Sequence, residues 1–458
     1  MNVQQSPQIY ECCAKSCICY AGPFSDLTVC PECNTPRKNA AGAPQNTYSY
    51  LPIIPQLRAL YCCPRTAEKL QYRHNYKRDN SVIQDIFDGD RYHQLCQTYV
   101  SIDGKRQPYK FFEDPREIAL GLSADGMCPF KRRKHSCWPL ILLNYNLPPD
   151  ERIHLGNILC VGVIPGPKSP KHLSSFLWPL IEELLELAAG TPAVDSRNAV
   201  VFALRAHLMS VFGDIPAITK FLEFVGHNGR YPCRFCLIMA IRGPTSKGGT
   251  HLYCPLHRPD GSVVQPFNLP LRTHHNTVEK GLEVLQAPSE NARTQLATNS
   301  GVKGVSLLAR LPSISIPFSF PIDIMHLVWI NLIPQLVKLW TGEFNGLDDG
   351  TESYMMHPTV WMSLGSTVAG SGATVPSSFG CRVPDISKPG HRTAECWSIF
   401  ATQLAPHLLR RRFRKPTYYT HFVRLIKLLN QCTTFTMLRS DLVEIRTGFA
   451  EWVQDFEK

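Results

Sequence analysis

The chain has 458 residues, of which 44% are hydrophobic and 19% are charged. This length and composition suffice for two or three domains with apolar cores, and they exclude a disordered tail. Lysine and arginine outnumber aspartate and glutamate by 48 to 37, a formal charge of +11. An anionic partner is therefore favoured, with nucleic acid first and an acidic protein or a membrane surface as alternatives.

The amino terminus lacks the basic region, apolar core and cleavage site of a secretory signal. The apolar stretch 314–340 is interrupted by three prolines and by Asp323, which argues against a membrane span. We therefore expect a protein of the cell interior with no membrane partner. In a reducing compartment its 18 cysteines are expected to bind metal rather than to form a disulfide framework.

Cysteines are dense near the amino terminus, where two close pairs are separated by about a dozen residues. The predicted ligands of a structural zinc ion are Cys13, Cys17, Cys30 and Cys33. Cys12 and Cys19 are alternative ligands in place of the first pair. The pattern predicts a zinc-ribbon-like module over residues 1–40, with a small and polar linker at 38–50.

The hydrophobic pattern between residues 117 and 222 predicts strands at 118–123, 139–147 and 158–164, then an amphipathic helix from 173 to about 190. A further buried strand is expected at 199–214, followed by a short helix that begins at Pro216. Three meandering strands, a crossover helix and a parallel fourth strand would form the first half of a ribonuclease-H-like α/β fold.

The rest of the chain is expected to be an irregular excursion followed by helices. Residues 239–305 are rich in Gly, Pro, Ser and Thr, which predicts a long surface loop. Helices are predicted at 322–341, 392–410, 416–435 and 438–457, and this half reads as an all-α insertion.

Two aspartates follow predicted strands. Asp125 comes after the first strand and Asp214 after the fourth, so adjacent strand ends would bring the two carboxylates together. Paired divalent cations about 3.5–4 Å apart require such convergence of oxygen ligands. The alternative uses are local, a turn aspartate before Gly126 and a helix N-cap before Pro216.

A second cysteine pair, Cys233 and Cys236, is half of a zinc site. Cys254 and His257 could complete it, because they add a Cys-x2-His pair nearby in the sequence. Alternatively, Asp323 and His326 begin a predicted helix that could pack against the pair. An N-cap aspartate with a partly buried histidine is the simpler interpretation of this last motif.

Taken together, the ordered segments YECCAKSCICYAGPFSDLTVCPEC, LSADGMCPFKRRKHSCWPLILLNYNLPPDER, FGDIPAITKFLEFVGHNGRYPCRFC, GVKGVSLLARLP and PIDIMHLVWINLIPQLVKLWTG resemble the CACTA (En/Spm-like) DNA transposases, in versions common in fungi. The resemblance spans nearly the whole chain. It implies a DDE/D ribonuclease-H-like core that binds Mg²⁺, hydrolyses transposon ends and joins them to target DNA.

Residue by residue, the resemblance makes Asp125 and Asp214 the first two catalytic carboxylates. It places Cys233, Cys236 and His326 in a zinc-binding insertion, with Asp323 as a further candidate ligand. The expected organisation is a cysteine module (1–40), a linker with connecting helices (41–112), the first half of the core (113–238), an irregular region (239–312) and a helical insertion (313–458). A nuclear protein with DNA as partner and no small-molecule substrate is implied, and self-association stays open.

The sequence departs from the family pattern after residue 458, where the helix that carries the catalytic glutamate would follow. Glu395 is the best substitute within the chain. We therefore expect a transposase fragment that is inactive in transposition. The alternative is a non-catalytic zinc-containing factor, derived from a transposase, that binds DNA or protein.

Two basic clusters could contact phosphates or direct nuclear import. One comprises Lys131, Arg132, Arg133 and Lys134, immediately after Asp125, and is the predicted DNA-binding segment. The other is RRRFRK at 410–415. A solvated charged surface is the alternative for both.

Overall fold

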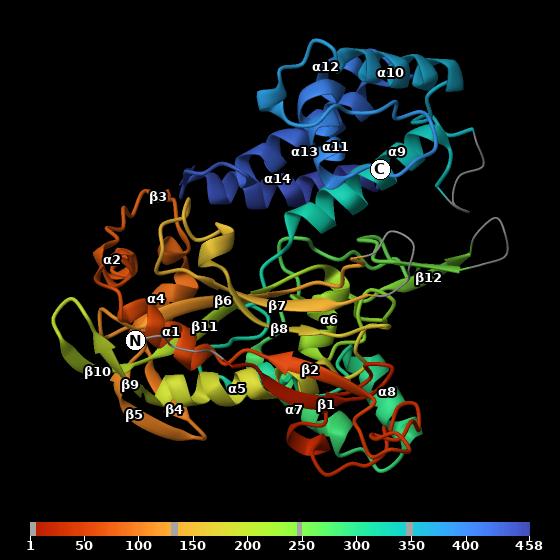
Figure 1. Cartoon of the computed structure of the whole chain (residues 1–458). Coiled ribbons are helices and arrows are strands. Elements are labelled where there is room, and N and C mark those ends of the chain that lie inside the picture. Colours follow the sequence, from red (N-terminus) through yellow and green to blue (C-terminus); the bar gives the residue numbers. More distant parts are fainter. Residues whose placement is uncertain (1–5, 130–135, 245–249, 345–350) are drawn as a thin grey trace.

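The computed structural model describes residues 6–129, 136–244, 250–344 and 351–458. It is a mixed α/β structure in which a six-stranded sheet lies beneath a separate group of helices (Figure 1). In spatial order the sheet contains β1 (Gln8–Cys12), β2 (Asn46–Tyr50), β8 (Leu159–Ile164), β7 (Trp138–Asn144), β6 (Ile118–Ala124) and β11 (Ala206–Phe212). Neighbouring strands are antiparallel except β6 and β11, which run parallel.

The order of strands and helices around β6 agrees with the expectation from sequence. The three meandering strands β6, β7 and β8 are followed by the crossover helix α5 (Leu173–Ala189) and by the parallel strand β11. Gly190 ends α5 with φ of +106°, a conformation that favours glycine. Helix α6 (Ile215–Leu222) follows β11 and has a proline in its first turn, as predicted.

Residues on alternate sides of the sheet belong to two cores. Leu120 and Leu122 of β6 point toward Phe176 and other buried residues of α5 in the main core. Ala119 of β6 belongs instead to a smaller cluster with Phe111 on the opposite face. Because both faces are covered, the centre of the sheet is buried.

The prediction of a single strand at 199–214 is wrong. The structure divides it into β10 (Val200–Leu204) and β11, with Arg205 between them. β10 pairs with β9 (Thr191–Asp195) in a hairpin outside the main sheet, and its alternate residues are exposed. The Arg205 guanidinium lies over the ring of Tyr109, so a charged side chain marks the junction between the two apolar runs.

The prediction of a linker at 38–50 is also wrong for the second half of that range. Residues 46–50 form β2, which joins β1 to the edge strand β8 of the meander. Tyr48 and Tyr50 are fully buried there, which a solvated linker would not allow. Strands β1 and β2 of the amino-terminal segment are therefore part of the sheet.

Residues between the first cysteine segment and β6 form short elements that flank the sheet. They are α1 (Ile53–Tyr61), α2 (Pro64–Lys69), α3 (Tyr72–Asn75), β3 (Val82–Ile83), α4 (Asp90–Gln97), β4 (Tyr99–Ile102) and β5 (Lys105–Lys110). A buried ion pair between Arg152 and Asp85, with 2.9 Å between nitrogen and oxygen, ties this region to the end of β7. Helices α1 and α2 contribute to the main core with α5, whereas α3, α4, β4 and β5 contribute to the smaller core.

The region expected to be irregular at 239–305 contains regular structure, so that expectation is wrong. It holds the hairpin β12 (Ile241–Pro244) and β13 (Thr250–Tyr253) and the helices α7 (His274–Leu285) and α8 (Glu290–Ser300). Thr273 and Ser289 cap these two helices with their hydroxyls, a local signal that composition alone conceals.

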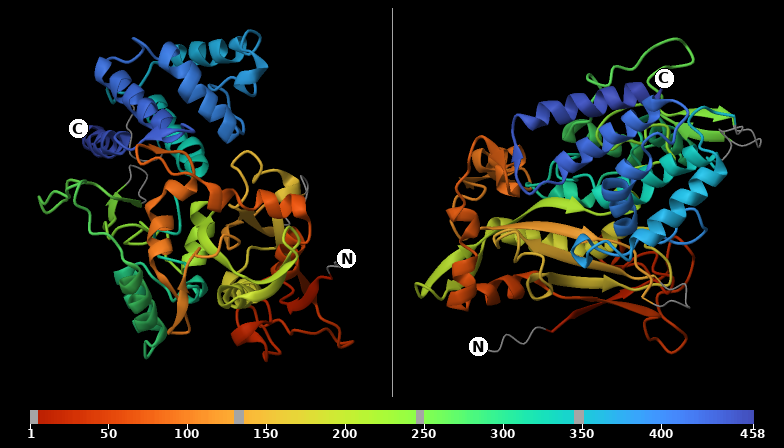
Figure 2. Two further views of the ribbon diagram at one scale, coloured as in Figure 1. Left: turned by 90° about the vertical axis from the view of Figure 1, so that its left-hand side faces the viewer. Right: turned by 90° about the horizontal axis from the view of Figure 1, so that it is seen from above.

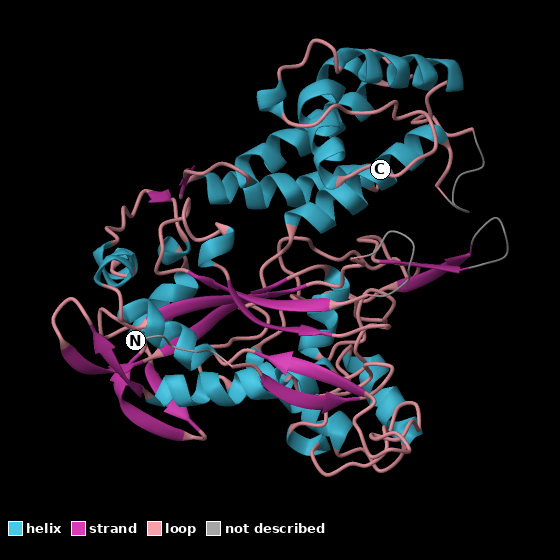
Figure 3. Ribbon diagram, viewed as in Figure 1, coloured by secondary structure: helices cyan, strands magenta, loops and turns pink. Residues whose placement is uncertain are grey.

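Beyond Ile322 the chain is helical, as predicted, and has a core of its own. The elements are a π-helical segment (Met325–Leu332), α9 (Ile333–Thr341), α10 (Pro358–Ser371), α11 (Ala394–Ile399), α12 (Ala405–Leu408), α13 (Pro416–Cys432), the two-residue strand β14 (Met437–Leu438) and α14 (Asp441–Phe456). Figure 2 shows this body as distinct from the sheet, and Figure 3 shows its helical content. No helix among the described residues is long and apolar enough to span a membrane.

Candidate active site

The carboxyl ends of β6 and β11 bring the two predicted aspartates to the same edge of the sheet. Phe212 is in register with Ser123, and Asp125 and Asp214 each follow two residues later. Asp125 is exposed, whereas Asp214 is partly buried. Because β6 and β11 are parallel neighbours, they end at the same edge of the sheet, and both carboxylates lie at that edge.

The close approach of these strand ends depends on Gly213. A Cβ atom built on this residue would lie 2.8 Å from the Ala124 carbonyl oxygen and 3.4 Å from the Ala217 Cβ. The first distance is shorter than van der Waals contact, and the obstructing atom belongs to the backbone. Glycine therefore allows β11 to reach the end of β6 beside Asp125.

We expect Gly213→Ala to lower the free energy of unfolding by about 1–3 kcal/mol, because overpacking forces the backbone to shift. Urea denaturation of the purified protein would measure this change. Gly156→Ala is the matched control, because a Cβ at that position meets no atom within 4 Å. Equal stability of the Gly213 variant and wild type would show that the strand ends can separate at no cost.

Asp214 also serves as the N-cap of α6. Its Oδ1 accepts a hydrogen bond of 2.6 Å from the Ala217 N–H, which is the local role considered from the sequence. This bond leaves the second carboxylate oxygen available for a cation. The N-cap role and a metal-binding role are therefore compatible.

The electrostatic surroundings of Asp214 reveal two further residues at this site. Burial raises the pKa of Asp214 above its ordinary value, the Ala217 N–H lowers it, and the Asp125 carboxylate raises it again. His326 lowers the pKa, and Asp323 raises it. The Asp-x2-His motif, assigned from sequence to a zinc site, therefore lies within electrostatic reach of Asp214.

Asp323 and His326 contact each other at the start of the π-helical segment. The His326 Nδ1 lies 2.6 Å from Asp323 Oδ2, and the His326 backbone N–H donates to Asp323 Oδ1 at 3.1 Å. π-helical turns are uncommon and frequently mark functional sites. A cavity of about 250 Å³ extends from Asp323 along α6 to Cys233.

Cys233 of the second cysteine pair lines this cavity. Neighbouring Cys236 lowers the pKa of Cys233 to about 6 by hydrogen bonding to its sulfur. Arg234, between the two cysteines, donates to the Pro321 carbonyl at 2.6 Å and so connects the turn to the segment before Asp323. The CRFC turn thereby supports the position of the Asp-x2-His motif.

The structure does not bring the predicted ligands of the second zinc site together. Within the described ranges, Cys233 and Cys236 belong to no group of three or more His, Cys, Asp or Glu ligand atoms lying within 4.8 Å of one another. His326 contacts Asp323, and the His257 Nδ1 lies 3.1 Å from a carboxylate oxygen of Glu457. The Cys-x2-Cys pair and the Asp-x2-His motif therefore lie along one cavity, but their side chains do not form one close ligand set.

The remaining predicted residues have varied positions. The Glu395 carboxylate accepts a hydrogen bond from the Cys381 N–H at 2.9 Å, a contact inside the helical body. Lys131, Arg132, Arg133 and Lys134 lie outside the described residues. Cys13, Cys17, Cys30 and Cys33 form a cluster of their own, and Cys12 and Cys19 are buried in the main core instead.

A comparison with known protein families gives a match to part of the chain. Residues 93–258 match a family model described as transposase family tnp2. This segment contains the meander, the crossover helix, both aspartates and the CRFC turn. The match supports a transposase family for this segment. No curated protein matches the chain.

Proposed function

We propose that this protein is a DNA transposase of the CACTA type with a ribonuclease-H-like core. The strand order β8-β7-β6-β11, with α5 connecting β8 to a parallel β11, supports that fold. The observation that carries the proposal is the convergence of Asp125 and Asp214 at the ends of adjacent parallel strands within the segment that matches the transposase family.

We further propose that Asp125, Asp214 and Asp323 supply oxygen ligands to divalent cations of the Mg²⁺ class. Carboxylates are the preferred protein ligands of hard cations. In the described residues the three carboxylates do not all lie within 4.8 Å of one another, so a bound cation would have to draw their side chains together. When bound, the ions would activate the attacking oxygen and stabilise the leaving oxygen of a phosphodiester. His326 would orient the Asp323 carboxylate, which it contacts directly.

Nicking of supercoiled plasmid DNA in the presence of Mn²⁺ tests the proposed chemistry. We expect no transposition by this chain, and any Mn²⁺-dependent nicking by it to be lost in Asp125→Asn and to persist in Asp103→Asn. Asp103 is a suitable control because its φ of +48° in the turn between β4 and β5 is readily adopted by asparagine. Nicking that is equal in Asp125→Asn and in the wild type would count against the carboxylates as its source.

The tract 410–415 is the proposed DNA-contacting surface in the described part of the chain. Its five cations are exposed, while Phe413 is buried against Trp340 with ring centroids 5.5 Å apart. The buried ring anchors the tract to the helical body and leaves the guanidinium groups in solvent. Such a cluster suits the phosphate backbone, which dominates the affinity of proteins for DNA.

Replacing Arg410, Arg411 and Arg412 by glutamine should weaken DNA binding and should make the affinity depend less on salt concentration. Each lost phosphate contact is expected to reduce the slope of log K against log salt by about 0.9. Fluorescence anisotropy over a salt series would measure both quantities. The control is Lys280→Gln with Arg293→Gln, two exposed cations that pair with glutamates on α7 and α8. An unchanged slope would remove the tract from the DNA-binding surface.

A further inference from the structure

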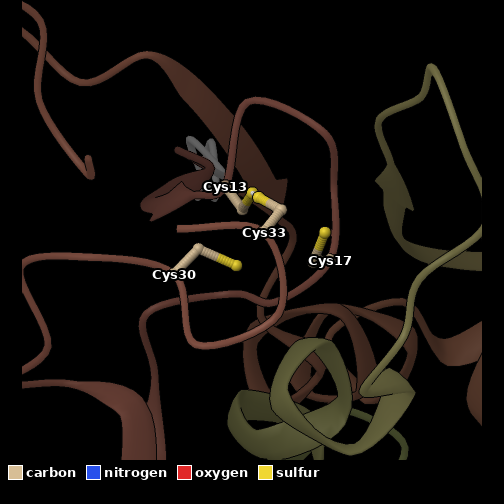
Figure 4. Close-up of side chains that lie close together, drawn as sticks. All are labelled: Cys13, Cys17, Cys30 and Cys33. Carbon is tan, nitrogen blue, oxygen red and sulfur yellow. Dashed lines mark hydrogen bonds between the residues drawn. The ribbon is translucent and has the colours of Figure 1, made fainter. Parts of the chain in front are cut away.

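Four cysteine side chains converge near the amino terminus. The sulfur atoms of Cys13, Cys17, Cys30 and Cys33 all lie within 4.8 Å of one another, and those of Cys13 and Cys33 are 3.5 Å apart (Figure 4). In the part of the chain that the structure describes, this is the one group of three or more such side chains so closely placed. It lies outside residues 93–258, the segment that matches the transposase family.

Each cysteine pair is held in a tight turn of the backbone. In the first pair, the Ser16 N–H donates to the Cys13 carbonyl at 2.7 Å, and Ser16 has φ of +58°. In the second pair, the Asn34 N–H donates to the Cys30 carbonyl at 2.9 Å, and Asn34 has φ of +54°. Asparagine tolerates this left-handed conformation better than most residues. The two turns point their sulfur atoms inward at a common centre.

The geometry fits one tetrahedral thiophilic cation better than a disulfide. All four cysteines are free, and the 3.5 Å between the sulfur atoms of Cys13 and Cys33 exceeds the length of a disulfide bond, about 2.05 Å. Zinc–sulfur bonds of about 2.3 Å at tetrahedral angles place the sulfur atoms about 3.8 Å apart, which the observed spacing approaches. Four protein thiolates leave no open position for a substrate, so the site would be structural.

The cluster is docked against the amino-terminal end of α5. The Cys17 carbonyl oxygen accepts hydrogen bonds from the N–H groups of both Lys171 and His172, each at 3.0 Å. The Cys19 N–H donates to the Ser175 hydroxyl at 2.9 Å. The Glu32 carboxylate, between the second pair of cysteines, lies 2.9 Å from His172 Nε2.

A close backbone contact adds to these hydrogen bonds. Gly22 has φ of +55° and lies directly against the Trp178 ring of α5, where a Cβ would be 2.2 Å from a ring carbon. The loop between the two cysteine turns therefore follows the surface of the crossover helix. Any ion that fixes the two turns would also fix this interface.

We propose that Cys13, Cys17, Cys30 and Cys33 bind one zinc ion that clamps the amino-terminal segment onto α5. The clamp holds β1 and β2 at the edge of the sheet and secures the start of the helix that precedes β11. It is independent of the proposed carboxylate site and of DNA cleavage. In this role the metal stabilises the catalytic fold, and the segment that binds it is not a separate DNA-binding zinc finger.

Metal analysis of the purified full chain and its variants tests the ligand set. We expect Cys30→Ser and Cys33→Ser each to lose one zinc ion per chain relative to the wild type. Cys12→Ser is the matched control, because Cys12 is adjacent to Cys13 and buried yet belongs to the main core. Equal zinc content in all four proteins would overturn the proposal, and so would peptide mapping that finds a disulfide between two of Cys13, Cys17, Cys30 and Cys33.

Hydrogen–deuterium exchange of the wild-type chain tests the clamp without any substitution. Removing zinc with a chelator should reduce protection both in residues 13–37 and at the start of α5, and adding zinc should restore it. Loss of protection confined to the cysteine loop would refute the clamp while leaving the metal site. Cobalt added to the chelated protein should develop thiolate-to-metal charge-transfer absorption, and its absence would refute the tetrathiolate site even if a variant fails to fold.

Discussion

Replacing Asp214 by asparagine is expected to abolish the binding of Mn²⁺ at the carboxyl ends of β6 and β11. Asparagine keeps the side-chain oxygen that accepts the Ala217 N–H, so α6 retains its cap. It removes the negative charge that a divalent cation needs beside Asp125. Isothermal titration calorimetry should therefore show a metal site in the wild type and none in Asp214→Asn. Asp103→Asn again serves as the control.

The same substitution should make the metal-free protein more stable at neutral pH. Burial and the neighbouring carboxylates raise the pKa of Asp214, so the native state binds its proton more tightly than the unfolded state does. The charged form of Asp214 therefore destabilises the native state. The contribution of this carboxyl group to the free energy of unfolding falls as the pH rises through its raised pKa. Thermal unfolding of Asp214→Asn and wild type, compared across pH in a chelator, measures the effect. A lower melting temperature of the variant at neutral pH would contradict the proposed electrostatics.

Metal binding at this site should strengthen as pH rises. Protons compete with cations for Asp214 up to a higher pH than for an ordinary carboxyl, because its pKa is raised. Calorimetric titrations of the wild type at several pH values would reveal this competition. An affinity for Mn²⁺ that is independent of pH in the acidic range would place the ion elsewhere.

The largest loss of stability is expected from Phe176→Ala. Phe176 is fully buried between α5 and the sheet, and its ring meets that of Tyr48 at 81° with centroids 5.4 Å apart. Removing a buried phenylalanine side chain typically costs about 3–5 kcal/mol, because packing is lost and a cavity remains. Urea denaturation would measure the change in free energy of unfolding.

The matched control for this prediction is Phe435→Ala. Phe435 is 98% exposed, so its removal should change stability little. Because Tyr48 belongs to β2, a large cost at Phe176 would confirm that the amino-terminal strands share the main core with α5. A cost below about 1 kcal/mol would indicate that the site relaxes or that β2 is loosely attached.

The alternation of buried residues in 118–164 and the helical spacing in 173–190 were sufficient to predict the centre of this fold from sequence. Those patterns reflect burial against a sheet and against one helix face, which are local properties of the chain. The pairing of β2 with β8 was not predictable in this way. It joins residues about a hundred positions apart, and its only local sign is the burial of Tyr48 and Tyr50.

The candidate site was predictable in part for a similar reason. Asp125 and Asp214 follow strands whose adjacency depends on the right-handed crossover of α5, a general rule of topology. Asp323 lies more than a hundred residues beyond Asp214, in a segment whose motif suggests zinc equally well. Only the fold shows that Asp323 interacts electrostatically with Asp214 and lines one cavity with Cys233.

Cleavage of the polypeptide by bound Fe²⁺ tests most directly whether the carboxylates form one metal site. In ascorbate and peroxide, an Fe²⁺ ion that replaces Mg²⁺ generates radicals that cut the backbone next to it. The predicted cuts lie at the end of β6 near Asp125, at the end of β11 near Asp214, and near Asp323. All three should disappear together in excess Mg²⁺ and in Asp125→Asn. Cuts at only one of these segments, or cuts that persist in Asp125→Asn, would contradict a shared site.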